Sequence, residues 1–179
     1  MLIEYFDNIT ETFDKIIGDI NFYESLTKII DLLKTAKQNN KFIYMFGNGG
    51  SAANASHFAN DLQKMAGFKV NCLNDNIPLM LAYANDLGYF TIFAKQLKTL
   101  IEKDDVVIGF SGSGNSLNVI QGLLLGNQKK AITIALTGFD GGMIKNTAQH
   151  SLIVPSNNMG QIESIHLIII HLIAEYFKT

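Results

Sequence analysis

The 179-residue chain contains no arginine, only one cysteine and only two prolines. All fourteen basic residues are lysines, so no guanidinium group is present to bind a phosphate or a carboxylate in a bidentate way. Any bound phosphate must therefore be held by backbone N–H groups, by hydroxyl groups or by lysine. The single cysteine, Cys72, excludes an internal disulfide and is compatible with a reducing compartment.

The chain also lacks a dense basic surface and a membrane-targeting segment. Its net charge of −2 argues against nucleic acid as a partner, because binding to the phosphate backbone requires clustered positive charge. The N-terminus has no basic region of the signal-peptide type, and His166 and His171 interrupt the longest apolar stretch. We therefore expect a cytoplasmic protein without a membrane partner. An apolar content of 47% suits one domain over residues 1–179.

Hydrophobic periodicity predicts the order of the secondary structure. Apolar residues recur at spacings of three and four near the N-terminus, which predicts two helices, the first over Leu2–Ile20. These helices pack either on their own domain or against another subunit. Buried runs then alternate with helical patterns, and the runs are KFIYMF, FKVNCL, DVVIGF, AITIAL and HSLIVP. The pattern predicts an α/β fold with a doubly wound parallel sheet and a long C-terminal helix.

The segment Lys41–Lys64 contains the strongest signal for a binding site. Its apolar run ends in residues 47–51, Gly-Asn-Gly-Gly-Ser, and a helical pattern with His57 and Asp61 follows. Glycines let the backbone approach a ligand closely, and the first N–H groups of a helix are unpaired, so we expect an anionic or hydroxyl-rich ligand. His57 and Asp61 lie one turn apart on one helix face. They either bind a metal, divide acid and base work, or simply face solvent.

A second loop, residues 111–116, has the composition of a phosphate-binding site. It follows the run DVVIGF and combines three serines and two glycines with the start of a helix, which is a phosphate site that needs no cation. Ligands of parallel sheets bind at the carboxyl ends of the strands, where this loop and the glycine loop both lie.

Two further loops carry weaker signals. The composition of residues 137–142 predicts a turn at Asp140, and we expect these residues to pack beside the site or to form its rim. Asn85 and Asp86 either contact a sugar hydroxyl or cap a helix, and capping is the favoured interpretation.

The C-terminal helix is strongly apolar but contains Glu163, His166 and His171. A buried carboxylate beside histidines is costly unless it is paired or bound to a metal. Glu163 and His171 are two turns apart and face similar directions, whereas His166 lies off that line and is interpreted as a hydrogen-bonded core or interface histidine. Glu163 and His171, together with His57 and Asp61, form a candidate ligand set for zinc or another first-row metal.

Four segments in register, GNGGSAANASHFANDL, SGSGNS, LTGFDGG and IESIHLIIIH, resemble the sugar isomerase (SIS) domain family and, within it, the phosphoheptose isomerases. These enzymes interconvert sedoheptulose 7-phosphate and D-glycero-D-manno-heptose 7-phosphate for lipopolysaccharide or capsule heptose. The resemblance covers nearly the whole chain. It implies a five-stranded parallel sheet, active sites at subunit interfaces, and a homotetramer joined by the helices of residues 1–40 and by the C-terminal helix.

The resemblance also implies roles for individual residues. Asp61 and His171 would be the base and the acid of an aldose–ketose isomerisation through an enediol. One zinc ion per subunit would be bound by His57, Asp61, Glu163 and His171. The phosphorylated sugar would be bound by Asn48, Gly49, Gly50, Ser51, Asn85, Asp86, Ser111, Gly112, Ser113, Ser116 and Glu163.

Three positions depart from the family pattern. Asp61 stands where the family has glutamate, and Glu163 stands where it has glutamine. Both keep an oxygen ligand, but Asp61 is one methylene shorter and Glu163 adds a negative charge. Met65 replaces a family arginine.

Two alternatives to a phosphoheptose isomerase follow from these departures: an isomerase for another phosphosugar, or a non-catalytic relative of the kind that assembles with the bacterial replication initiator. Retention of acids at positions 61 and 163 together with both histidines favours an enzyme. A nucleotide-binding Rossmann protein is a third interpretation, because residues 47–52 match a loose G-x-G-x-x-A pattern and Asp75 resembles a ribose-binding acid. It leaves the serine loop unexplained.

Overall fold

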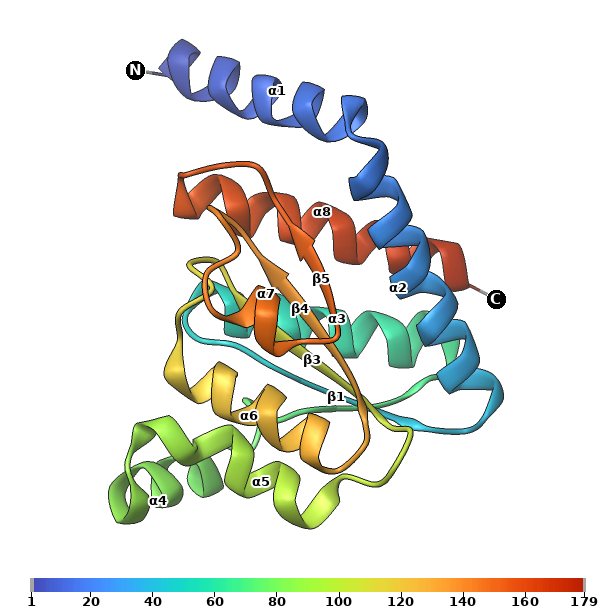
Figure 1. Ribbon diagram of the computed structural model, residues 1–179, viewed down its shortest axis with the longest axis vertical. Helices are drawn as coiled ribbons and strands as arrows, with labels where there is room; N and C mark the ends of the chain where they lie inside the picture. The colour runs from blue at the N-terminus through green and yellow to red at the C-terminus, as the bar shows by residue number, and fades with distance from the viewer. Residues whose placement is uncertain (1, 179) are drawn as a thin grey trace.

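The computed structural model describes residues 2–178, in which two leading helices precede alternating strands and helices (Figure 1). All five apolar runs form strands, which confirms the α/β prediction. In chain order, the elements are α1 (Leu2–Gly18), α2 (Ile20–Gln38), β1 (Phe42–Phe46), α3 (Gly50–Ala66), β2 (Lys69–Cys72), α4 (Ile77–Leu87), the 3₁₀ helix η1 (Tyr89–Thr91), α5 (Ile92–Leu100), β3 (Val106–Ser111), α6 (Leu117–Gln128), β4 (Ile132–Thr137), α7 (Ile144–Thr147), β5 (His150–Ile153) and α8 (Met159–Phe177).

The sheet has five parallel strands in the order β2-β1-β3-β4-β5. The order reverses at β1, because the chain passes from β1 outward to β2 and then returns to β3 on the other side of β1. In the register of this pair, Phe46 of β1 lies opposite Gly109 of β3. The carboxyl ends of β1 and β3 are therefore neighbours, and the glycine loop and the serine loop leave the sheet side by side.

Helices cover both faces of the sheet, as Figure 1 shows. On one face, α2, α3 and α8 bury side chains such as Leu33, Leu62 and Ile170 against the strands. On the other face, α5 and α6 pack on the sheet, and the rings of Phe46 and Phe93 stack with centroids 4.7 Å apart. Strand side chains are buried on both faces, which explains why the strand sequences do not alternate between polar and apolar residues.

The predicted end of the first helix, Ile20, is wrong. The helix ends at Gly18, and Asp19 starts a new helix by accepting a hydrogen bond from the Asn21 N–H at 2.9 Å. An aspartate at this position satisfies an N–H group that has no partner within the helix. Ile20 therefore belongs to α2.

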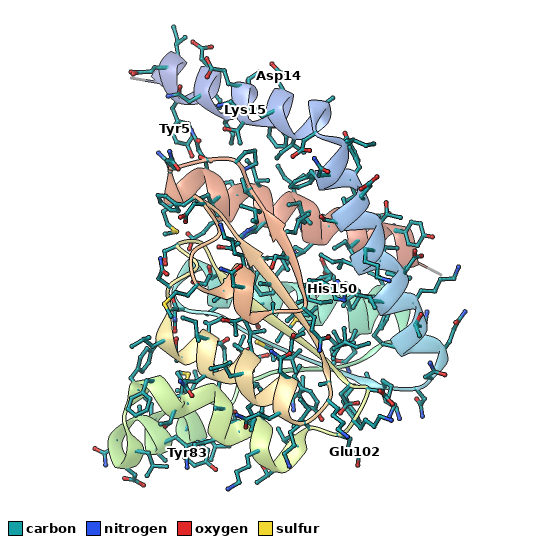
Figure 2. All side chains as sticks on the ribbon, in the orientation of Figure 1. Tyr5, Asp14, Lys15, Tyr83, Glu102 and His150 are labelled. Atoms are coloured by element: carbon teal, nitrogen blue, oxygen red, sulfur yellow. The ribbon has the colours of Figure 1, made fainter. Side chains whose placement is uncertain are left out.

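The two N-terminal helices pack differently. The buried side chains of α2 lie on the sheet, so one face of this helix packs on its own domain. In contrast, α1 leaves Ile3, Phe6 and Ile17 exposed. Figure 2 shows Tyr5 on the side of α1 that faces the start of α8, and its hydroxyl lies 3.9 Å from the position that a Cβ atom on Gly160 would occupy. Most of the apolar surface of α1 is thus uncovered in a single chain.

None of the helices within residues 2–178 has the length and apolar character required to cross a bilayer. The most extended apolar helix, α8, instead packs on α3 and on the sheet.

His166 on α8 is a hydrogen-bonded core histidine, as predicted. It is fully buried, and its Nε2 lies 3.1 Å from the carbonyl oxygen of Thr137, so Nε2 carries the proton and donates. Within the described residues, Nδ1 has no hydrogen-bond partner. Burial lowers the pKa of His166 to about 4. The folded protein therefore keeps this side chain neutral.

This histidine makes the stability of the fold depend on pH. The pKa of His166 is about 4 in the folded protein, whereas the ordinary pKa of a histidine is 6.5. The unfolded chain therefore binds the proton more readily, and stability falls as the pH drops from 6.5 towards 4. We expect His166 to contribute a loss of up to about 3 kcal/mol over this range, since one pKa unit corresponds to about 1.4 kcal/mol. Urea unfolding of the wild type and His166→Leu across these pH values measures the difference. Parallel pH profiles would contradict the prediction.

Candidate active site

A cavity of about 270 Å³ lies at the carboxyl ends of β1 and β3. It brings together both predicted ligand loops and the first turns of α3 and α8. Every residue expected to bind the substrate lines it, except Asn85 and Asp86. The lining residues are Asn48, Gly49, Gly50, Ser51, Phe110, Ser111, Gly112, Ser113, Ser116, Met159 and Glu163.

The glycine loop opens the N-terminus of α3 towards this cavity. Gly49 precedes the helix with a φ of 55°, and no side chain caps the helix there. Gly50 lies against the carboxylate of Glu163 so closely that a Cβ atom at this position would collide with it. The absence of a side chain at Gly50 thus leaves room for Glu163, and the unpaired N–H groups of the first turn are available to a ligand.

The serine loop forms a second part of the cavity lining. The hydroxyl of Ser111 donates to the hydroxyl oxygen of Ser116 at 3.1 Å, and Ser113 Oγ accepts from the Asn115 N–H at 3.3 Å. Ser116 precedes α6 without capping it through its side chain. Among the lining residues, Glu163 is the only one that ionises. Phosphate binding by this chain alone would therefore use hydroxyl and N–H groups, as the absence of arginine implies.

The loop of residues 137–142 packs against the serine loop, as predicted. The Gly138 N–H donates to the Gly112 carbonyl oxygen at 2.9 Å, and the Ile144 N–H donates to the Gly114 carbonyl oxygen at 2.9 Å. Asp140 forms the expected turn, because its Oδ1 accepts from the Gly142 N–H at 3.0 Å. The loop of residues 137–142 and the start of α7 therefore hold the backbone of the serine loop in place.

Binding of phosphate by the serine loop can be tested at Ser113. Replacing Ser113 with alanine removes the hydroxyl of a residue that lines the cavity. We expect about tenfold weaker binding of inorganic phosphate, the effect of losing one hydrogen bond to a charged group. Isothermal titration calorimetry measures the affinity. The control is Ser151→Ala, which removes a hydroxyl on β5, outside the cavity lining. Equal affinities for Ser113→Ala and the wild type would contradict phosphate binding at this loop.

Two residues near the cavity were not predicted. Asn118, in the first turn of α6, exchanges two hydrogen bonds of 2.8 Å with the Asn48 amide. The Tyr89 hydroxyl donates to Asn48 Oδ1, also at 2.8 Å. The sequence contains a weak signal for Asn118, a lone amide in the apolar pattern that follows the serine loop. It contains none for Tyr89, which η1 places beside Asn48.

Asn85 and Asp86 do not cap a helix, so that interpretation is wrong. They lie in the last turn of α4, whose N-cap is Asn76 and whose C-cap is Gly88. The Asn76 side chain accepts from the Leu79 N–H at 3.3 Å. The Asn85 side-chain amide donates to Asp86 Oδ1 at 2.9 Å, and both residues are exposed. In the described chain, neither residue lines the cavity.

A second cluster lies further along α3 and α8. The Nε2 atoms of His57 and His171 are 2.7 Å apart. Asp61 Oδ2 lies 3.2 Å from His57 Nε2 and 3.8 Å from His171 Nε2. Two facing Nε2 atoms at this distance cannot both carry a proton, so at least one offers a lone pair. One potential ligand atom from each residue lies within 4.8 Å of the others, which is a donor set that suits a divalent metal.

Glu163, the fourth expected metal ligand, is not part of this group. Its carboxylate lies beside Gly50, and its backbone carbonyl oxygen accepts from the Asn54 side chain at 2.9 Å. Glu163 and His171 are eight residues apart on α8, which corresponds to a rise of about 12 Å along the helix axis. The same face of α8 therefore contributes Glu163 to the cavity and His171 to the cluster. The structure brings three of the four predicted ligands together and places the fourth in the cavity.

Comparisons with known proteins found similar sequences and a similar structure. The SIS domain family profile matches residues 4–138. A phosphoheptose isomerase of Helicobacter pylori is 38% identical over 157 residues, which cover 85% of this chain and 82% of the relative. A phosphoheptose isomerase of Aliarcobacter butzleri is 37% identical over 171 residues, covering 92% and 89% of the two chains. The structure of a phosphoheptose isomerase from Neisseria gonorrhoeae superposes with a TM-score of 0.93 at 30% identity, covering 98% of this chain and 96% of the other.

Proposed function

The chain belongs to the SIS domain family, and from this membership we propose that it is an aldose–ketose isomerase converting sedoheptulose 7-phosphate into D-glycero-D-manno-heptose 7-phosphate. The observation that carries the proposal is the pairing of two features along α3 and α8. One is a cavity lined by serine hydroxyls and helix N-termini, and the other is a cluster of two histidines and a carboxylate. The named relatives that match most of the chain are phosphoheptose isomerases.

The reaction requires a base, an acid and stabilisation of negative charge on oxygen. A base removes a proton from C1 of the ketose, the electron pair of that C–H bond forms the C1=C2 double bond, and the carbonyl oxygen becomes an enediol hydroxyl. The O1 hydroxyl then loses its proton, the C1=O double bond forms, and the electron pair of the C1=C2 double bond takes a proton at C2, which gives the aldose. We assign the carbon proton to Asp61 and the oxygen proton to His171, whose Nε2 lies 3.8 Å from Asp61 Oδ2. Serine hydroxyls and the N-terminus of α6 bind the phosphate.

The convergence of His57, Asp61 and His171 supports a zinc site at these side chains. When bound, zinc supplies electrophilic stabilisation of the enediol oxygens. Asp61 has one carboxylate oxygen near the histidines, and its other oxygen accepts from the Asn60 side chain at 3.2 Å, which orients the carboxylate. For Glu163, whose carboxylate lies in the cavity, we propose contact with the sugar.

Exposed apolar side chains support an oligomer, and the family resemblance implies that it has four subunits. Those on α1 include Ile3 and Phe6, and those on α8 include Ile168, Leu172 and Tyr176. Surfaces of this kind are buried in stable oligomers. We propose that residues 1–40 and α8 form the subunit contacts of a single SIS domain, residues 1–179, acting in the cytoplasm.

A substrate panel tests the proposed activity. We expect purified protein to convert sedoheptulose 7-phosphate into an aldose, and to convert fructose 6-phosphate and ribulose 5-phosphate at least tenfold more slowly. Separation of the products by anion-exchange chromatography measures the rates. A preference for another ketose phosphate would reassign the substrate. Failure to convert any of them, in a preparation that contains the expected metal, would favour a non-catalytic member of the family.

A further inference from the structure

The side chain of Asn48 has almost all of its hydrogen-bonding capacity engaged by the protein. Its Nδ2 donates to Asn118 Oδ1, and its Oδ1 accepts both from Asn118 Nδ2 and from the Tyr89 hydroxyl, each at 2.8 Å. Asn118 is buried, whereas Tyr89 is exposed. Asn48 itself lines the cavity at the end of β1.

The orientation of this amide pair follows from a third contact. The backbone N–H of Val119, which is a donor only, points at Asn118 Oδ1 from 3.0 Å. The oxygen of the Asn118 amide must therefore face Val119 and Asn48 Nδ2, and its NH₂ group must face Asn48 Oδ1. A flipped Asn118 would place two N–H donors against each other. The Asn48 amide is consequently held in one orientation.

Counting the remaining capacity shows what Asn48 can offer to a ligand. A primary amide has two N–H donors and an oxygen with two lone pairs. One N–H and both lone pairs of Asn48 are used within the protein. The only hydrogen-bonding group of the Asn48 side chain that remains free for a ligand is its second N–H. Asn48 therefore presents a donor, and no acceptor, to whatever enters the cavity.

A donor fixed in this way suits a negatively charged oxygen. The unpaired N–H groups at the start of α3, which follow Asn48 directly, have the same polarity. Donors that are oriented before the reaction stabilise charge that develops in the transition state, because they do not have to reorient.

On the basis of the proposed isomerase function, we propose that Asn118 and Tyr89 are positioning residues. They hold the Asn48 amide so that its free N–H donates to the sugar oxygen that gains negative charge in the enediolate. In this arrangement, Asn118 also connects the two ligand loops, since it lies on the helix that follows the serine loop and bonds to the glycine loop. An unrestrained Asn48 would turn its oxygen to the cavity part of the time and repel the same charge.

Two inhibitors separate this role from general binding. A hexonohydroxamate 6-phosphate has a head group that resembles the enediolate, and a heptitol 7-phosphate has the same phosphate without that charge. For Asn118→Ala, we expect the affinity for the hydroxamate to fall at least thirtyfold and the affinity for the heptitol phosphate to fall less than threefold. The kcat of isomerisation should fall with the hydroxamate affinity, while KM changes little. Calorimetry and steady-state rates provide these values.

The matched control is Asn127→Ala. Asn127 lies on the same helix and makes two side-chain hydrogen bonds, to the Thr147 carbonyl oxygen and the Thr133 hydroxyl, but it does not contact Asn48. We expect its loss to reduce stability and to leave the ratio of the two affinities unchanged. If Asn118→Ala lowered both affinities equally, or neither, the proposal would be overturned.

Tyr89→Phe is the second variant, because Tyr89 is exposed and the change removes only a hydroxyl. Without this hydroxyl, one lone pair of Asn48 Oδ1 has no partner in the protein and can face the ligand. We therefore expect a threefold to tenfold loss of hydroxamate affinity with an unchanged melting temperature. An unchanged hydroxamate affinity would refute the role of Tyr89. The wild type separates this proposal from the proposed function: if it neither isomerises sedoheptulose 7-phosphate nor binds either inhibitor, the isomerase function fails and this proposal with it.

Discussion

Replacing Asp61 or His171 with alanine is expected to lower the turnover of sedoheptulose 7-phosphate by at least about 10³-fold, the range of lost acid–base catalysis combined with lost metal binding. Asp61 Oδ2 is 3.2 Å from His57 Nε2, and His171 Nε2 is 2.7 Å from the same atom, so each substitution removes one of three converging groups. We expect the fold to remain intact, because His171 is exposed and the polar contacts of the buried Asp61 carboxylate are to the exposed Asn60 and to the two exposed histidines. Rate assays, metal analysis by mass spectrometry and circular dichroism measure the three effects.

Two matched variants control for a change of charge or of histidine content. Glu175→Ala removes an acid on α8 that pairs only with Lys178 among the described residues, and His150→Ala removes a histidine on β5. Both should keep the metal content and the rate of the wild type. Asp61→Ala or His171→Ala with a wild-type rate would refute the assignment of these two residues.

Replacing Gly114 with alanine is expected to disrupt the phosphate site. Gly114 has a φ of 69°, which costs a residue with a side chain about 1–2 kcal/mol. A Cβ atom here would also collide with the backbone carbonyl group of Gly141, and backbone cannot move aside as a flexible side chain can. We expect a loss of about 3 kcal/mol of stability and at least tenfold weaker phosphate binding. Urea unfolding and phosphate titration measure both values.

Gly18→Ala is the control for this substitution. Gly18 ends α1, has no positive φ, and has no atom within 4 Å of an added Cβ. Its replacement should leave phosphate affinity unchanged. A Gly114→Ala protein with wild-type stability and phosphate affinity would show that the serine loop does not require this backbone conformation.

Periodicity and loop chemistry were sufficient to predict the sheet and the position of the cavity. Strands such as DVVIGF are buried on both faces, and this leaves a clear sequence signal of continuous apolar residues. Because parallel strands end at one edge, the glycine loop and the serine loop had to lie near each other once both were placed after strands. The i, i+4 spacing of His57 and Asp61 likewise determined that they share a helix face.

Contacts between distant segments were not predictable in this way. The hydrogen bond between Tyr89 and Asn48 depends on how η1 packs against α6, and no local sequence pattern records that arrangement. The position of Glu163 depends on the close approach of α8 to Gly50, which spacing along α8 alone does not reveal. Asn85 and Asp86 were misread because Asn76 provides the N-cap nine residues earlier in the sequence.

The most direct test of the proposed isomerisation is proton NMR of sedoheptulose 7-phosphate incubated with the protein in D₂O. We expect signals of the aldose to appear in proportion to the amount of wild-type protein, with solvent deuterium at C2 of the product, and to be absent with Asp61→Ala. Unchanged ketose with the wild-type protein, or aldose formed equally fast by Asp61→Ala, would contradict isomerisation at this site.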